Sequence, residues 1–265
     1  MAPSQSKQII KQAAGFTFDG ITLDGADCEK EMGERDEHAG ARGKKMGGRG
    51  AVRMVAATQN MRGLTSESDR EEIRLQMERQ HIDLVCGQET WMNTDKSMQR
   101  WDTGELFLNC GGQMGKKHEG VCFFLSAKAT KMFERGGRKL MKYCSRLATL
   151  RLKLKGGKDI YIINGHAPDS GQTVAKRQAF QQKLERALRA AGSKDVLILM
   201  GDFNAAVGTA DDDGDEVSGE HGTSHVNAAG KELKMLATAH GLQDLVTMEE
   251  QSFYGTWVNP WLPWR

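Results

Sequence analysis

An aspartate and an asparagine, separated by one residue, follow an apolar run in the second half of the chain. Val196–Met200 consists of five apolar residues, which predicts a strand that is buried on both faces. Gly201 ends this run, and on an extended segment the side chains of Asp202 and Asn204 would point the same way. A carboxylate beside a carboxamide can hold a phosphate, a metal ion or a water molecule. Gly, Asp and Asn are also common turn residues, so this stretch alone is equally compatible with a turn and with a site.

Three other apolar runs, each predicted to be a strand, end on or just before a polar side chain. These side chains are Asn60, Glu89 and His166. No basic residue lies near Glu89 in the sequence, so a buried carboxylate there needs a metal ion or a proton. Carboxylate and amide oxygens suit Mg²⁺, which binds through few protein ligands and keeps several waters. Each residue alone is more often structural than catalytic, whereas the whole set in this order indicates a site.

The first ordered part of the chain is predicted to form strand, helix and strand over residues 52–90. A capping box at Ser68–Glu71 predicts the start of the helix, and Ile73 and Met77 follow on one face at helical spacing. Both strands therefore carry polar side chains at their carboxyl ends.

Residues 105–165 are predicted to be sheet. Gly120–Leu125 is a short apolar run typical of a buried strand. Further on, leucines alternate with Arg151 and Lys153, which indicates a strand with one solvated, basic face. Gly156–Gly157 then predicts the turn of a hairpin.

Two helices are expected in the second half of the chain. The first is predicted to be capped by Asp169 or Ser170 and to bury a face that includes Phe180, and the second is predicted to stop at Gly241. Because parallel-type crossovers alternate with hairpins, the chain is predicted to form a mixed α/β sandwich rather than a doubly wound parallel sheet.

The composition is that of a globular protein with little net charge. The chain has 265 residues, of which 38% are hydrophobic and 27% charged, and its formal net charge is +2. Charge alone therefore does not indicate a nucleic-acid binder, and any basic surface must be local. No apolar run reaches the length of a membrane span or forms a signal core. The five widely spaced cysteines include no Cys-x-x-Cys, which favours a reducing compartment, nuclear or cytoplasmic, over secretion.

Two polar segments are predicted to be linkers or loops. The basic run Gly40–Gly50 is interpreted as a solvated linker, with contact to nucleic-acid phosphates as the alternative. The acidic loop Asp211–Glu216 has a spacing close to that of a calcium-binding EF-hand. However, Thr209 stands at the first ligand position and no helix is predicted to enter the loop, so a calcium site is rejected.

The polar strand ends, taken together, resemble the endonuclease/exonuclease/phosphatase family of DNase I and the abasic-site endonucleases. Within that family the chain is most similar to the endonuclease domains of RTE-type non-LTR retrotransposons and to craniofacial-development-like proteins. His166 stands where tyrosine is more usual, and Phe253–Trp257 is similar to the family's aromatic-Thr-Trp strand. The matching pieces are Thr58–Gly63, Gly87–Thr90, Ile162–Pro168 and Gly201–Ala205.

The resemblance implies a DNase I-like α/β fold, a four-layer αββα sandwich of mixed sheets, over residues 51–257. A flexible Gly/Lys/Arg-containing segment at 1–50 and a tail at 258–265 flank this domain. The family ends on a strand that carries an Asp-His pair, whereas no Asp-His dipeptide follows Trp257 here. We therefore expect a C-terminally truncated domain that lacks the last strand.

The same resemblance implies a role for each polar strand end. Glu89 is expected to ligate Mg²⁺, or Mn²⁺ as an alternative, with Asn60 beside it. Asp202 is expected to orient or deprotonate the attacking water, and Asn204 to hold that water and the phosphate. His166 is expected to contact the phosphoryl group. The implied reaction is hydrolysis of a phosphodiester in DNA, in which a cation and hydrogen-bond donors stabilise the charge on the phosphorane.

Three functions follow from these observations. The first is a Mg²⁺-dependent DNA endonuclease of retrotransposon type. Its activity is expected to suffer from the missing Asp-His, since losing one charge-stabilising group costs on the order of a hundredfold in rate. The second is an inactive relic of the nuclease that binds nucleic acid or a protein partner. The third is a phosphatase of the same fold, although no segment suggests a loop for a lipid head group.

Overall fold

The computed structural model describes residues 16–17, 54–112, 119–154, 159–210 and 217–248. No helix in these ranges has the length and apolar character that a membrane crossing requires. Several expectations concern other parts of the chain. Those outside the described residues are Cys28, most of the segment 1–50, the turn Gly156–Gly157, the loop Asp211–Glu216, the segment Phe253–Trp257, the last strand and the tail 258–265.

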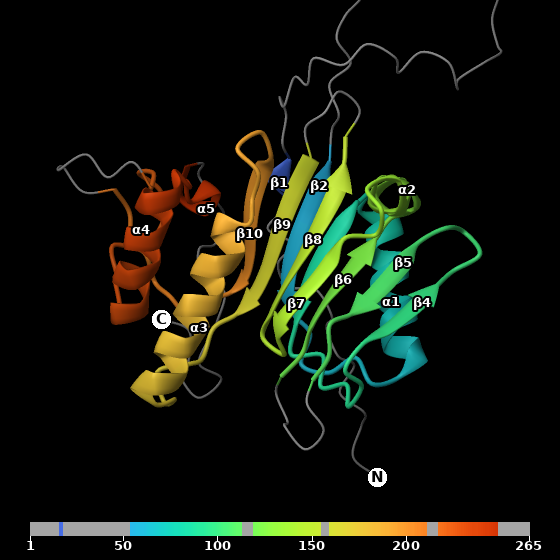
Figure 1. Ribbon diagram of the computed structural model, residues 1–265, viewed down its shortest axis with the longest axis horizontal. Helices are drawn as coiled ribbons and strands as arrows, with labels where there is room; N and C mark the ends of the chain where they lie inside the picture. Colours follow the sequence, from blue (N-terminus) through green and yellow to red (C-terminus); the bar gives the residue numbers. More distant parts are fainter. Residues whose placement is uncertain (1–15, 18–53, 113–118, 155–158, 211–216, 249–265) are drawn as a thin grey trace, which may run out of the picture.

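Two mixed sheets form the centre of the molecule (Figure 1). The larger sheet has, in spatial order, β1 (Phe16–Thr17), β2 (Val55–Asn60), β3 (Leu84–Gln88), β6 (Val121–Leu125), β5 (Leu106–Asn109) and β4 (Ser97–Arg100). The smaller sheet has β10 (Val196–Asp202), β9 (Asp159–His166), β8 (Leu147–Lys153) and β7 (Leu140–Cys144). The pairs β2–β3 and β9–β10 are parallel, so in each sheet two neighbouring strands end at the same edge.

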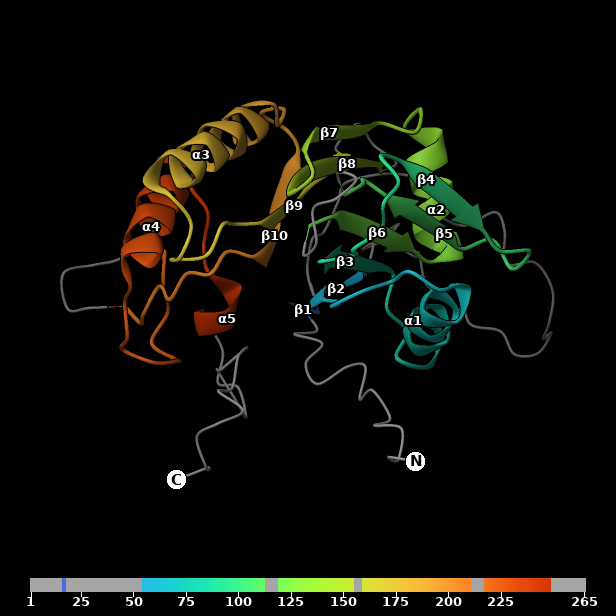
Figure 2. The ribbon, with the colours of Figure 1, turned by 90° about the horizontal axis from the view of Figure 1, so that it is seen from below.

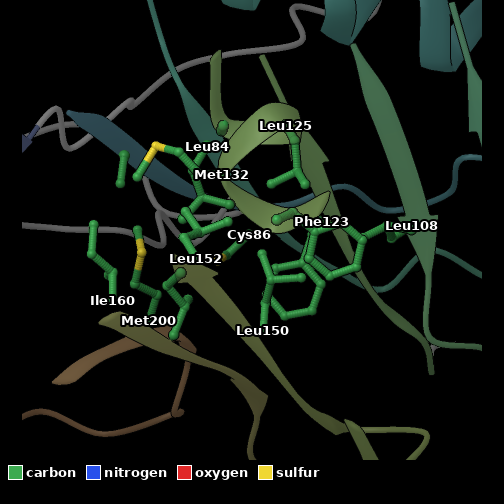
Figure 3. Packing of buried hydrophobic residues seen from close by; sticks show 14 of the residues in the cluster. Leu84, Cys86, Leu108, Phe123, Leu125, Met132, Leu150, Leu152, Ile160 and Met200 are labelled. Carbon is green, nitrogen blue, oxygen red and sulfur yellow. The ribbon is translucent and has the colours of Figure 1, made fainter. Parts of the chain in front are cut away.

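Helices cover the outer faces of both sheets (Figure 2). Ile73 of α1 packs on the outer face of the larger sheet, and Leu184 of α3 packs on the outer face of the smaller one. Between the sheets, the inner faces share one apolar core that includes Phe123 and Leu150 (Figure 3). The predicted α/β fold, a four-layer αββα sandwich, is therefore confirmed. The helices are α1 (Glu67–Arg79), α2 (Ala127–Arg135), α3 (Val174–Arg189), α4 (Ala228–His240) and α5 (Leu245–Met248).

The prediction of sheet throughout 105–165 is wrong over α2. Ser126 caps this helix by accepting a hydrogen bond from the backbone N–H of Ala129. Met132 and Phe133 lie on the buried side of the helix and pack into the core between the sheets. The helix is short, so few of its residues can display helical periodicity in the sequence, and apolar strands on both sides conceal it.

The starts of two helices differ from the prediction. Ser66, not Ser68, caps α1, and it forms a capping box with Asp69. Thr173 caps α3. Asp169, which was predicted as the cap of α3, instead accepts a hydrogen bond from the N–H two residues later and so closes a turn of its own.

The apolar run that forms β10 lies at the end of the smaller sheet rather than in its centre. Ile198 packs towards the core between the sheets, whereas Leu197 and Leu199 pack towards the helices on the outer face. Both faces are therefore covered, as predicted, but only Met200 is fully buried. An apolar run in the sequence indicates that both faces of a strand are covered, but it does not indicate whether the strand lies in the centre or at the edge of its sheet.

The basic face predicted for β8 is covered at Arg151, whereas the side chain of Lys153 on the same face is 43% exposed. The side chain of Arg151 is 17% exposed, and it forms ion pairs with Asp159 and Asp195. Its guanidinium group lies 4.6 Å from the centre of the Tyr161 ring. Arg151 therefore links β8 to Asp159 of β9 and to Asp195, and its charge is largely shielded from solvent.

One polar contact crosses the apolar interior between the sheets. Asn164 of β9 is fully buried, and its Nδ2 donates to the carbonyls of Gly87 (3.1 Å) and Cys122 (2.8 Å) in the larger sheet. Its Oδ1 accepts a hydrogen bond from Gln88 Nε2 at 2.8 Å. Because Gly87 and Gln88 are the last residues of β3 and Asn164 lies two residues before the end of β9, the contact joins the two strands near their polar ends.

We predict that replacing Asn164 with Ala lowers the free energy of unfolding by about 3 kcal/mol, because two buried carbonyls and the Gln88 amide lose their partner. Chemical denaturation measures this loss. The matched control is Asn93→Ala at an exposed bend, which is expected to change stability by less than about 0.5 kcal/mol. Equal stabilities of the two variants would show that Asn164 does not hold the sheets together.

Candidate active site

The carboxyl ends of β2, β3, β9 and β10 meet where the two sheets approach each other. In the larger sheet, Asn60 is paired with the residue just before Glu89. In the smaller sheet, His166 is paired with Asp202. The parallel pairing within each sheet therefore places two of the predicted site residues side by side. The packing of the sheets then decides whether the two pairs meet.

Asn60 joins the two pairs. Its amide nitrogen donates to Glu89 Oε1 at 2.7 Å and lies 3.4 Å from Asp202 Oδ2, so one carboxamide contacts carboxylates from both sheets. The Oδ1 of Asn60 faces the other way and accepts a hydrogen bond from the N–H of Arg62 at 3.3 Å. Two carboxylates that were predicted separately are thus neighbours.

The ring of His166 is the fourth side chain of this group. It is buried, and its Nε2 lies 3.8 Å from Glu89 Oε1. The side chain of Glu89 is 18% exposed, so the carboxylate is partly shielded from water and still reachable. The structure therefore brings Asn60, Glu89, His166 and Asp202 into one cluster.

Arg146 orients the His166 ring from behind. Its Nη1 lies 3.2 Å from His166 Nδ1 and 3.4 Å from the backbone carbonyl of the same residue. A guanidinium group can only donate, so Nδ1 accepts and the neutral ring carries its proton on Nε2, facing Glu89. Burial and the positive charge of Arg146 lower the pKa of His166, against the opposing effect of Asp202 and Glu89.

Arg146 and its partner Glu119 lie at the candidate site, and neither was predicted from the sequence. Glu119 forms an ion pair with Arg146 at 3.4 Å and also accepts a hydrogen bond from Ser145. Both residues lie immediately outside buried strands, Arg146 directly before β8 and Glu119 two residues before β6. A charged residue at the entrance to an apolar strand is the signal that could have drawn attention to them.

The chain turns at the predicted Asp-x-Asn piece instead of continuing in an extended conformation. Asn204 has a φ of 48°, and its N–H donates to Asp202 Oδ1 at 3.1 Å. Its Nδ2 donates to the carbonyl of Ala167 at 2.9 Å. The prediction that the two side chains point the same way from a strand is therefore wrong. The turn and the candidate site, which the sequence left as alternatives for Asp202–Asn204, therefore coincide.

The backbone of the site adopts conformations that side chains rarely allow. Glu89 and Asn204 have φ values of 53° and 48°, in the left-handed region that costs non-glycine residues about 1 kcal/mol or more. Gly201 has a φ of 143°, and a Cβ there would lie 1.9 Å from the carbonyl oxygen of Gly165. Such conformations persist only where surrounding contacts hold them, and they are concentrated at functional sites.

The donor groups fit a divalent cation that needs few protein ligands. In the described ranges, no set of three or more His, Cys, Asp or Glu side chains is arranged to hold a metal ion. The cluster instead offers the carboxylate oxygens of Glu89 and Asp202, which suit Mg²⁺, while Asn60 turns its amide nitrogen towards them and its oxygen away. A single N–H₂ group now lies between two negative charges, a position that favours a cation.

The sequence model of the endonuclease/exonuclease/phosphatase family matches residues 57–265. A comparison with curated proteins finds no match.

Solved structures with a similar arrangement include two AP endonucleases and a retrotransposon domain. AP endonuclease LMAP from Leishmania major is 18% identical, with a TM-score of 0.47, over 69% of this chain and 65% of that one. An AP endonuclease from Archaeoglobus fulgidus is 15% identical, with a TM-score of 0.44, over 69% and 70% of the two chains. The endonuclease domain of TRAS1, a telomere-specific non-LTR retrotransposon, is 11% identical, with a TM-score of 0.41, over 70% and 69%.

We predict that Arg146→Met raises the pKa of His166, because the variant removes a positive charge next to the ring and leaves the carboxylates in place. A ring-proton NMR titration measures the change. Arg186→Met, at an exposed position of α3, is the matched control and leaves the pKa unchanged. A His166 pKa that stays constant or falls in Arg146→Met would contradict the assigned contact.

Proposed function

Because this chain belongs to the endonuclease/exonuclease/phosphatase family, we propose that it hydrolyses phosphodiester bonds of DNA with a divalent cation, as an endonuclease of retrotransposon type. The observation that carries the proposal is the convergence of Glu89 and Asp202, from different sheets, on the carboxamide of Asn60. Two carboxylates that share one neighbour can serve two purposes, one holding a cation and the other a water molecule.

Glu89, with Asn60 beside it, is proposed to hold Mg²⁺ or Mn²⁺. When bound, the cation supplies positive charge to the phosphate and makes the attacking water more acidic. Asp202 is proposed to orient that water and accept its proton. The N–H of Asn204 holds Asp202 Oδ1, so the carboxylate is fixed in direction while Oδ2 faces the gap between the sheets.

His166 and Asn204 are proposed to contact the phosphate. The neutral ring of His166 carries its proton on Nε2, which makes it a hydrogen-bond donor to a phosphate oxygen. The amide nitrogen of Asn204 has two hydrogens and donates one of them to Ala167, which leaves one for the phosphate or the water. Both donors are positioned before the substrate arrives, and this saves reorganisation when charge develops.

The proposed setting is a reducing compartment, nuclear or cytoplasmic. Within the described residues, Cys86, Cys110, Cys122 and Cys144 are free thiols. Burial raises the pKa of Cys86, Cys110 and Cys122, which keeps these three protonated and unreactive. DNA is the proposed partner, because the site offers donors and carboxylates suited to a phosphodiester.

We predict that the chain nicks supercoiled plasmid DNA in the presence of Mg²⁺ or Mn²⁺ and that EDTA abolishes the nicking. Glu89→Ala and Asp202→Ala should each lower the rate by a factor on the order of a hundred or more, because each removes a group that acts on the transition state. A gel assay with initial rates measures the loss.

The matched controls are Glu72→Ala and Asp102→Ala, which remove exposed carboxylates of α1 and of the β4–β5 turn. They are expected to keep the wild-type rate. Nicking that neither Glu89→Ala nor Asp202→Ala reduces would overturn the assigned site. DNA binding that weakens with salt, without any nicking, would favour the non-catalytic binding protein. Hydrolysis confined to phosphomonoesters would favour the phosphatase.

A further inference from the structure

The amino end of α4 lies against the turn that carries Asp202 and Asn204. Asn227 caps this helix, and its Oδ1 accepts a hydrogen bond from the N–H of Gly230 at 2.7 Å. The same oxygen accepts a second hydrogen bond, from the N–H of Ala206 at 3.1 Å. The cap of α4 therefore also binds the segment that leaves the site.

Two further bonds join Asn227 to this segment. Its Nδ2 donates to the backbone carbonyl of Asn204 at 3.3 Å, and its N–H donates to the carbonyl of Ala206 at 3.1 Å. One residue further out, Val207 and Val226 form an isolated antiparallel bridge. The segment after Asn204 is thus paired with the segment before α4 through a short ladder that ends on the Asn227 side chain.

Gly230 allows the first turn of α4 to approach so closely. A Cβ at this position would lie 1.8 Å from the carbonyl oxygen of Ala206, a distance that no side chain can occupy. Gly230 is fully buried, although it lies in the first turn of an otherwise partly exposed helix. Helix propensity disfavours glycine inside a helix by about 1 kcal/mol, so its presence indicates that the close approach is needed.

We propose that Asn227 is a positioning residue that holds Asn204 in its left-handed conformation and thereby aims the Asp202–Asn204 turn at the substrate. Asn204 has a φ of 48°, so its peptide needs contacts on both sides to keep this orientation. On one side the N–H of Asn204 donates to Asp202, and on the other its carbonyl accepts from Asn227. Loss of the second contact removes one of the two bonds that hold this conformation, and the N–H of Asn204 that directs the Asp202 carboxylate is then held less tightly.

Asn227→Asp separates this role from helix capping. The variant keeps an oxygen that can accept from Gly230 and Ala206, and an acidic side chain suits the amino end of a helix. It loses the donation to the Asn204 carbonyl and places a carboxylate oxygen against that carbonyl, which repels it. We expect a melting temperature within a few degrees of wild type, a backbone Cα chemical shift of Asn204 that moves away from the left-handed value, and a kcat lower by a factor of ten or more with KM little changed.

Thr173→Ala is the matched control, since it removes the cap of α3 and leaves the site intact. It is expected to lower the melting temperature and to keep kcat and the Asn204 shift unchanged. Asn227→Ala, which loses both roles, should show both effects. An Asn227→Asp variant with wild-type Asn204 shifts and wild-type kcat would overturn the proposal.

The kinetic part of this inference rests on the proposed function, whereas the chemical-shift part does not. If the wild-type chain fails to cleave DNA, the proposed function fails, and the Asn204 shift in Asn227→Asp still decides whether Asn227 holds the turn. If the chain cleaves DNA and the shift is unchanged, only the positioning role is wrong.

Discussion

Two carboxylates from different sheets, Glu89 and Asp202, approach the same carboxamide, that of Asn60. Like charges repel more strongly when they are partly withdrawn from water, so a positive partner would stabilise this arrangement. The packing of the sheets has to supply the force that keeps the two groups together. Asn164 of β9 contributes directly. Its buried side chain donates to the carbonyl of Gly87 in β3, the strand that ends before Glu89, and to the carbonyl of Cys122 in β6.

The surrounding residues hold the site in place rather than react. Arg146 determines which nitrogen of His166 carries the proton, and the left-handed backbone at Glu89 and Asn204 directs the chain away from the sheets. α4 supports the turn at Asn204 through Asn227. Rigid support of this kind matters because catalytic groups that shift by about 1 Å lose on the order of a hundredfold in rate. The αββα sandwich thus serves as a frame for four strand ends.

The sequence allowed the strand ends to be predicted because the signal is local: an apolar run followed by a polar residue, as at Asn60 and Asp202. The four-layer arrangement came from resemblance to a family rather than from periodicity. The contact of Arg146 with His166 could not be predicted, because it depends on how β8 pairs with β9. The same holds for Asn227, whose cap signature is visible in sequence, while its contact with Asn204 arises only when α4 packs on the loop.

The proposed chemistry requires that a divalent cation binds among Glu89, Asp202, Asn60 and His166. Crystals of the protein grown or soaked with Mn²⁺ test it directly, because the anomalous signal of manganese locates the ion without reference to activity. The account predicts a peak within about 2.3 Å of a Glu89 carboxylate oxygen, and no such peak in Glu89→Ala. Manganese bound only elsewhere on the protein, with the Glu89 carboxylate still bonded to Asn60, would contradict it.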